Sequence, residues 1–330
     1  MAGEALIADL IELGGVGMSA TELGDGGGAD MRLGGGPGVV RVGVHRGGPV
    51  PDEAPELFDI LLSDDPAAPR PWVGIAGAEL DAALDRLSAA VGRQPLAAAV
   101  AAQVLRMTLQ VPFADALALE SLAYSMLLAS APFRAWRAAT AVRERPEAKT
   151  PRVLVSEAEG VLEIRLNRPA RRNAIDAPMR DELADALAFA LEHPDAPPVV
   201  LSGAGTAFSA GGDLDEFGAA ADPGEAHLIR TLRSPARLAH RLGPRLTARL
   251  HGACVGGGIE IPAAAGRVTA APGTHFRLPE VSMGLVPGAG GTATIPRRIG
   301  RRRAAWLAIC GEDLDLATAL AWGLVDEVAS

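Results

Sequence analysis

The residues best suited to chemistry lie between His251 and Thr292. In this stretch a run of three glycines, from Gly256 to Gly258, is followed by Glu260 and later by Glu280. Glycines ahead of a helix let the backbone approach a ligand closely, and they leave amide N–H groups without partners at the positive end of the helix dipole. Such amides suit a developing negative charge, so we expect the rest of the chain to position this stretch.

Composition excludes several classes of protein. The chain has 330 residues, 48% of them hydrophobic, which suits a globular protein of about two domains. Its net charge of −9 argues against a nucleic-acid partner, because phosphate neutralisation needs a basic surface. Cys254 and Cys310 are too few for a disulfide framework or a zinc site. The N-terminus lacks the basic region of a signal peptide, and no run of about 18 apolar residues exists to span a membrane. We therefore expect a soluble, cytoplasmic protein.

Residues 1–78 are rich in glycine, so ordering their backbone is costly. Val39 to Val44 has the pattern of a strand, Glu53 to Leu62 that of a short helix, and Pro71 to Ile75 that of a second strand. This segment is therefore predicted to contain one small β-α-β unit. A phosphate-binding loop is not indicated, because no strand, glycine loop and long helix follow one another here.

Residues 79–150 change to helical periodicity. Pro95 and Pro112 divide them into three helices, because proline ends a helix. The predicted apolar faces are Leu80, Leu84, Leu87 and Val91; Val100, Val104, Met107 and Val111; and Leu119, Leu122 and Met126. Three amphipathic helices need a surface to pack on, so we expect them to cover another domain or subunit. The charged, proline-containing stretch from Val142 to Pro151 is the predicted linker.

Residues 151–330 alternate between strand and helix patterns. The predicted strands are Val161 to Leu166, Pro198 to Leu201, Leu246 to Leu250 and Arg267 to Ala271, and the predicted helical segments are Met179 to Leu191 and Ala221 to Leu242. This alternation predicts a layered α/β fold in which loops at one edge of the sheet form the site.

Five ordered motifs in this part of the chain resemble those of the crotonase superfamily, the enoyl-CoA hydratase and isomerase family. They are LNRPARRNAI (Leu166 to Ile175), AFSAGGDLDEF (Ala207 to Phe217), HGACVGGGIE (His251 to Glu260), LPEVSMGLVPGAGGT (Leu278 to Thr292) and ALAWGLVDEV (Ala319 to Val328). The resemblance implies a β-β-α spiral core, spanning 151–330, that binds acyl-coenzyme A. It also implies two backbone amides that stabilise the thioester enolate, and these match Gly212 and Gly257.

Two glutamates match the acid/base pair of family members that add water to a 2-enoyl thioester. Hydration needs a base that takes a proton from water and an acid that delivers one to the α-carbon. The resemblance implies Glu280 as the proton donor and Glu260 as the group that orients and activates the water. Their proximity is expected to separate their proton affinities. The alternative is that either one is a solvated surface residue.

Coenzyme A carries phosphates, and arginine suits phosphate recognition. Arg168, Arg171 and Arg172 lie in the segment that lines the nucleotide and pantetheine in the family, with Ala174 near the pantetheine; Ala210 completes the predicted contacts. Asp213 follows an oxyanion glycine and is interpreted as a structural helix cap. The basic run from Arg297 to Arg303 is interpreted as a solvated helix face, in preference to a second phosphate contact or a subunit-facing patch.

The resemblance further implies an assembly of three or six copies, an acyl-CoA substrate that brings coenzyme A with it, and no metal or redox cofactor. Typical members continue beyond GLVDEV into helices that close the pocket, whereas this sequence ends at Ser330. The stretch from Pro112 to Ala138 resembles those helices, so we infer that they stand before the core, as in a circular permutation.

Two other functions stay open. Helices before the core also occur in the branch that contains the cofactor-independent dihydroxyphenylacetyl-CoA dioxygenases, although an acid at Glu260 favours hydration. Pro262 is compatible with a helix only in its first turn, and if it displaced Glu260 the chain would be a non-catalytic acyl-CoA-binding subunit.

Overall fold

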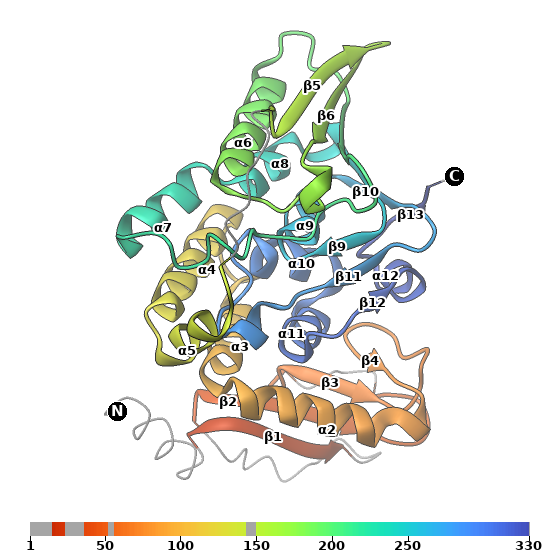
Figure 1. The fold of residues 1–330 in the computed structure, drawn as a ribbon. Helices are drawn as coiled ribbons and strands as arrows, with labels where there is room; N and C mark the ends of the chain where they lie inside the picture. The colour runs from red at the N-terminus through yellow and green to blue at the C-terminus, as the bar shows by residue number, and fades with distance from the viewer. Residues whose placement is uncertain (1–14, 24–35, 52–55, 143–149, 330) are drawn as a thin grey trace.

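The computed structural model describes residues 15–23, 36–51, 56–142 and 150–329 (Figure 1). An N-terminal parallel sheet lies at one end, and helices α2 to α5 connect it to a larger α/β core. The predicted linker from Val142 to Pro151 falls mostly outside the described residues.

The N-terminal sheet has the strand order β1-β2-β3-β4 within the described residues, and all its pairs are parallel. The strands are β1 Val16–Leu23, β2 Gly38–His45, β3 Ile60–Ser63 and β4 Val73–Gly74. The strand predicted at Val39 to Val44 is confirmed, but the helix predicted at Glu53 to Leu62 is wrong where it is described. Ile60 to Leu62 are fully buried, and a short apolar run buried on both faces suits a parallel strand.

Four helices follow this sheet: α2 Gly77–Arg93, α3 Pro95–Met107, α4 Phe113–Leu128 and α5 Ala131–Ala139. The breaks at Pro95 and Pro112 are confirmed. The apolar face predicted for α4 is wrong, because Leu122 and Met126 are 57% and 54% exposed. Helix α4 instead buries a mixed set of apolar and polar residues: Ala116, Leu117, Glu120, Ser121 and Leu127.

No single helix in the described ranges is long and apolar enough to cross a membrane. Helices α4 and α5 reach such a length only as a pair, and they are bent by 68° at the break between them. Both also bury residues inside the protein, Leu127 of α4 and Phe133 of α5.

The core contains a larger sheet in the order β13-β10-β8-β7-β6-β5, in which only the β5–β6 pair among the described strands is antiparallel. Its strands are β5 Val153–Ala158, β6 Val161–Leu166, β7 Val199–Gly203, β8 Leu246–Leu250, β10 Arg267–Ala270 and β13 Glu327–Val328. A smaller sheet has the order β12-β11-β9, with β9 Ala253–Val255, β11 His275–Arg277 and β12 Leu314–Asp315. The four strands predicted from the alternation in 151–330 are confirmed. Strand β5 and the short strands β9, β11, β12 and β13 were not predicted.

The helices of the core surround these sheets. They are α6 Ala177–Glu192, α7 Pro223–Leu232, α8 Pro235–Leu242, α9 Gly257–Glu260, α10 Gly291–Ile299, α11 Arg301–Cys310 and α12 Leu316–Trp322. Single 3₁₀ turns occur at Pro169–Arg171, Gly243–Arg245, Pro262–Ala264 and Glu280–Met283. Helix α9 ends before Pro262, so this proline does not interrupt it.

Helix α11 lies between the N-terminal sheet and the core (Figure 1). Its arginines form hydrogen bonds to the N-terminal part. The interpretation of the basic run as a solvated face is wrong for Arg302 and Arg303, which are buried. Arg302 donates to the carbonyl of Phe58 at 3.2 Å. Arg303 donates to the carbonyls of Trp72 at 2.8 Å and Ala68 at 3.1 Å. The loop carbonyls next to β3 and β4 thus accept hydrogen bonds from charged side chains of α11.

Arg303→Ala should lower the free energy of unfolding by about 2–4 kcal/mol, because two carbonyls lose a charged donor in a buried contact. Its packing over the Trp322 ring, 5.1 Å away, is lost as well. Urea denaturation measures the effect. Arg93→Ala, on an exposed part of α2, is the control and should stay within about 0.5 kcal/mol of wild type. Equal losses in the two variants would contradict the importance of the contact.

Candidate active site

Two glycine loops lie against each other at the centre of the core. Ser209 forms an isolated parallel bridge with Cys254, and Ile175 forms another with Gly212. Gly211 has φ +86°, and a Cβ placed there would lie 2.7 Å from the carbonyl oxygen of Val255. Only glycine therefore permits this close approach, which brings the Gly212 and Gly257 segments together.

The amides of Gly212 and Gly257 have no hydrogen-bond acceptor among the described residues. Both glycines line the same cavity, which has a volume of about 610 Å³. Residues of α4, α7 and the Glu280–Met283 turn complete its wall. Two unpaired amides on one cavity are suited to bind an oxyanion, so the structure brings the two predicted donors together.

Glu260 and Glu280 meet beside these amides. A Cβ on Gly256 would lie 2.3 Å from Oε1 of Glu280 and 3.6 Å from Oε1 of Glu260, so both carboxyls reach the same point over this glycine. Both side chains are buried and line the cavity. The alternative that either is a solvated surface residue is excluded by this burial.

Backbone amides hold Glu260 in place. Its Oε2 accepts hydrogen bonds from the amides of Ala289 and Gly291, both at 2.8 Å, at the start of α10. The partial positive charge of a helix N-terminus favours a carboxylate there. Glu280 differs, because its Oε2 is buried without a hydrogen-bond partner among the described residues. One carboxyl is thus held by donors while the other points into the cavity.

The two carboxyls titrate at different pH values, as expected for a coupled pair. Burial raises the pKa of Glu260 to about 7, although the amides of Ala289 and Gly291 lower it. Burial and the nearby charge of Glu260 raise the pKa of Glu280 well above its usual range. Their mutual hydrogen bond lowers the pKa of Glu260 and raises that of Glu280. Glu280 therefore retains its proton longer.

Helix α4 contributes an acid that was not predicted. Glu120 is 2% exposed, lines the same cavity, and accepts hydrogen bonds at 2.7 Å from the amides of Gly290 and Thr292 and from the Thr292 hydroxyl. Burial, and then the charge of Glu260, raise the pKa of Glu120 to about 8. A signal existed in the sequence, because Glu120 is a lone acid within the apolar stretch ALALESLAYSM.

Asn173 connects the segments that carry the site, and it too was not predicted. Its Oδ1 accepts from the amide of Arg168 at 2.8 Å, and its Nδ2 donates to the carbonyls of Ala204, Ala207 and Phe208. The residue is fully buried with φ +51°, a conformation that asparagine tolerates better than most residues. Through these hydrogen bonds, Asn173 holds the chain segment that leads into the Gly212 loop.

Of the three arginines predicted to contact coenzyme A, two are paired with carboxylates and one is exposed. Arg168 is buried and donates to Asp213 at 2.7 Å, and Arg171 pairs with Asp215 at 2.8 Å. Asp213 is structural as expected, but it acts through these ion pairs and not as a helix cap. Arg172 is exposed.

The two alanines predicted beside coenzyme A lie next to these arginines. The carbonyl of Ala174 accepts from Arg168 at 2.9 Å, and the amide of Ala210 donates to the carbonyl of Arg172 at 2.8 Å. Both alanines are half-buried. The segment around Arg168 is thus tied by backbone contacts to the loop that carries Gly212.

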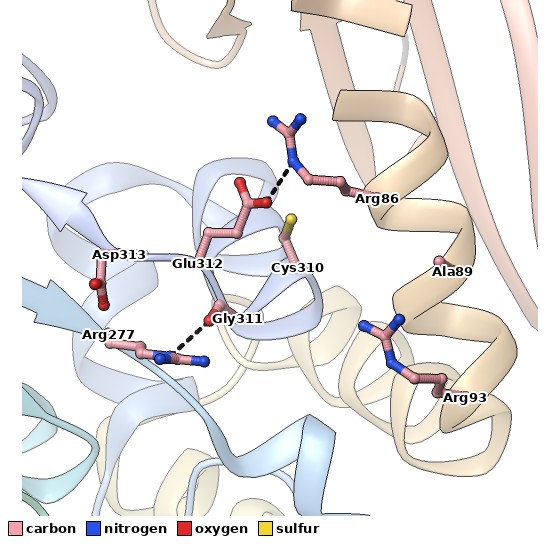
Figure 2. Close-up of a pocket in the computed structure, with 8 residues that line it drawn as sticks. All are labelled: Arg86, Ala89, Arg93, Arg277, Cys310, Gly311, Glu312 and Asp313. Atoms are coloured by element: carbon pink, nitrogen blue, oxygen red, sulfur yellow. Dashed lines mark hydrogen bonds and ion pairs between the residues drawn. The ribbon is translucent and has the colours of Figure 1, made fainter. Parts of the chain in front are cut away.

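A second hollow of about 420 Å³ lies between α2 and the end of α11 (Figure 2). Figure 2 shows Arg86 directed at Glu312, with a 2.5 Å contact, and Arg277 directed at the carbonyl of Gly311 at 2.8 Å. Its lining is polar and charged, and none of the predicted site residues lies in it. The chemistry therefore belongs to the larger cavity.

Comparison with known proteins agrees with this geometry. Residues 156–330, more than half of the chain, match the model of the enoyl-CoA hydratase/isomerase family. The chain belongs to this family. It is 36% identical over 176 residues to a mevalonyl-coenzyme A hydratase of Beauveria bassiana and 33% identical over 181 residues to a 2,3-dehydroadipyl-CoA hydratase of Escherichia coli. These alignments cover 51% and 53% of this chain, and 63% and 68% of the respective relatives.

Solved structures show the same fold. The chain resembles an enoyl-CoA hydratase from Thermoplasma volcanium with 36% identity and a TM-score of 0.51, covering 55% of this chain and 73% of the other. An enoyl-CoA hydratase from Bacillus anthracis gives 31% identity and a TM-score of 0.50, with 54% and 70% covered. The predicted crotonase-like α/β core is confirmed.

Gly256→Ala should lower the free energy of unfolding by about 2–4 kcal/mol. At φ +49° a side chain strains the backbone, and its Cβ would also displace the Glu280 carboxyl. Gly273→Ala is the matched control, because Gly273 has φ +80° but its Cβ would meet nothing within 4 Å. That variant should lose only the backbone cost of about 1–2 kcal/mol in urea denaturation. A Gly256→Ala loss no larger than the control's would show that the crowding is relieved without cost.

The protein should lose stability as pH rises from about 4.5 to about 8. The folded-state pKa values of Glu260, Glu280 and Glu120 are raised from 4.5. Their protonation therefore stabilises the fold fully below pH 4.5, and this contribution is lost as pH rises through the raised values. The slope is at most about 1.4 kcal/mol per pH unit for each proton. Urea denaturation across this range should show a flatter slope for Glu280→Gln, and parallel slopes would contradict the assignment.

Proposed function

We propose that this protein is an enzyme of the enoyl-CoA hydratase/isomerase type that acts on an acyl-CoA thioester. One observation carries the proposal: the amides of Gly212 and Gly257, which have no hydrogen-bond acceptor in the part of the chain that the structure describes, share a cavity with the carboxyl pair Glu260 and Glu280. The thioester oxygen fits between the amides, which stabilise the charge that develops on it in the enolate. The names of the relatives, which include hydratases and an isomerase/hydratase, support the same reaction class.

In the hydration direction, Glu260 takes a proton from water while the water oxygen bonds to the β-carbon of the enoyl thioester. The electron pair of the double bond moves to the thioester oxygen, which the two glycine amides hold as an enolate. The enolate collapses, and its α-carbon takes the proton of Glu280. Proton exchange from Glu260 to Glu280 restores the starting state. The raised pKa of Glu280 and the lower one of Glu260 match these roles of acid and base.

We propose that Arg168 and Arg171 position the Gly212 loop, because carboxylates already hold their guanidinium groups. Arg172, which is exposed, then remains to meet a phosphate of coenzyme A, with Ala174 and Ala210 beside it. We also propose an assembly of three or six copies and no metal or redox cofactor, because of the resemblance in 151–330. The displaced helices are proposed because Pro112 to Ala138 resembles the family's C-terminal helices. The cytoplasmic location is proposed because the two cysteines are too few for a disulfide framework.

The test is turnover of crotonyl-CoA, followed by the loss of absorbance of its conjugated thioester. The protein should hydrate this substrate, and Glu280→Gln should lose at least about a hundredfold in kcat, because the α-carbon loses its proton donor. Glu312→Gln, in the polar hollow away from the cavity, is the control and should retain full activity. An unimpaired Glu280→Gln variant would contradict the role of this carboxyl.

If wild-type protein binds coenzyme A esters without hydrating crotonyl-CoA, the assignment for this substrate is wrong. Oxygen consumption with an aryl-acetyl-CoA would then identify the dioxygenase alternative. Binding with neither reaction would identify a non-catalytic acyl-CoA-binding protein.

A further inference from the structure

Glu120 lies outside the part of the chain that matches the family, on helix α4, yet it reaches the same cavity as Glu260 and Glu280. The three carboxyls are buried together, and the charges of Glu120 and Glu260 act on each other. Nothing in the mechanism above uses Glu120. Its place beside the acid/base pair therefore needs an explanation.

Four consecutive amides at the start of α10 are divided alternately between two carboxylates. Those of Ala289 and Gly291 donate to Glu260, and those of Gly290 and Thr292 donate to Glu120. Successive N–H groups in this turn point to opposite sides, so neither carboxylate alone satisfies the turn. If Glu120 moved, the turn would be held on one side only, and the two donors of Glu260 would lose their fixed direction.

A neutral glutamine could not replace this carboxylate, because Oε1 accepts from the amide of Gly290 and Oε2 accepts from Thr292, whereas glutamine has only one acceptor oxygen. The geometry of the turn thus requires a carboxylate, which can also carry a charge. Glu120 makes all its hydrogen bonds as an acceptor, the pattern of an ionised group. Its charge acts on Glu280 and raises the pKa of that carboxyl.

We propose that Glu120 is a positioning residue for the acid/base pair. It holds the first turn of α10 so that the amides of Ala289 and Gly291 stay directed at Glu260. When Glu120 is ionised, its negative charge also keeps the transferable proton on Glu280. This inference rests on the proposed function of the site and adds to it a residue supplied by a helix ahead of the family core.

Several charged or titratable groups surround Glu120 and bear on its ionisation. Glu260 and Glu280 face it from the core, and Arg230 faces it from α7. Arg230 is held by the Ser121 hydroxyl at 3.0 Å and lies over the ring of Tyr124, 4.9 Å from its centroid. His227 contacts the same hydroxyl at 2.9 Å. Arg230 therefore partly balances the negative cluster.

The first test is Glu120→Gln in the full chain, with crotonyl-CoA as substrate. We expect kcat to fall about tenfold, with KM changed less than about threefold, because the pair loses its alignment. The basic limb of the pH profile of kcat/KM should move about one unit to lower pH, because a nearby negative charge no longer raises the pKa of Glu280. Asp115→Asn removes a charge from an exposed position on the same helix, and it should leave both quantities unchanged.

Thr292→Val tests the same contact if Glu120→Gln does not fold. It removes the hydroxyl donor to Glu120 at 2.7 Å but keeps the shape of the side chain and the backbone amide. The basic limb of its kcat/KM profile should move to lower pH by about half as much as in Glu120→Gln. A loss of activity with an unmoved basic limb would overturn the proposal, because a merely structural contact predicts that result. Unchanged kinetics in both variants would overturn it as well.

A direct titration separates this inference from the proposed reaction. Carbon-13 NMR of glutamate carboxyls follows Glu280 without substrate, and its resonance is the one absent from Glu280→Gln. Its titration midpoint should move about one unit lower in Glu120→Gln. An unchanged midpoint overturns the charge role of Glu120 whether or not crotonyl-CoA is turned over. A moved midpoint in a protein that does not hydrate crotonyl-CoA supports the role and rejects only the assigned reaction.

Discussion

The hydrogen bonds from the first turn of α10 to buried carboxylates determine how the rest of the site is arranged. A buried carboxylate is expensive unless donors surround it, and this turn supplies the donors for Glu260. The glycines at Gly290 and Gly291 are required for that, because a Cβ at Gly291 would lie 2.7 Å from Cγ of Glu260. The position of the acid/base pair thus depends on small residues in a loop that itself takes no part in the reaction.

The two oxyanion glycines depend on a different set of contacts. Asn173 joins three carbonyls of the preceding segment, and Ser209 links that segment to the Gly211 amide at 3.1 Å. Arg168 adds an ion pair with Asp213 directly after Gly212. These contacts fix the loop around Gly212, whose amide has no hydrogen-bond acceptor within the described ranges.

Local patterns predicted much of this arrangement, and distant contacts account for what they missed. Gly212, Gly257, Glu260 and Glu280 lie in short motifs that resemble those of the enoyl-CoA hydratase/isomerase family, and this resemblance predicted the site. Glu120 could not, because its contact with Gly290 joins residues 170 positions apart. Contacts between residues distant in the sequence also explain why the prediction for Arg302 and Arg303 was wrong. A run of arginines predicts a solvated face, and only the approach of the N-terminal sheet shows why they are buried.

The contact of α11 with the N-terminal sheet has a consequence for synthesis on the ribosome. Arg303 and Trp72 meet across 231 positions of sequence, so strands β2 to β4 leave the ribosome long before the helix that donates to their loop carbonyls. Until α11 is made, these loops remain open to water or to chaperones, and such long-range contacts form slowly. The nascent chain therefore carries an incompletely covered parallel sheet through most of its translation, and its final enclosure is a late event.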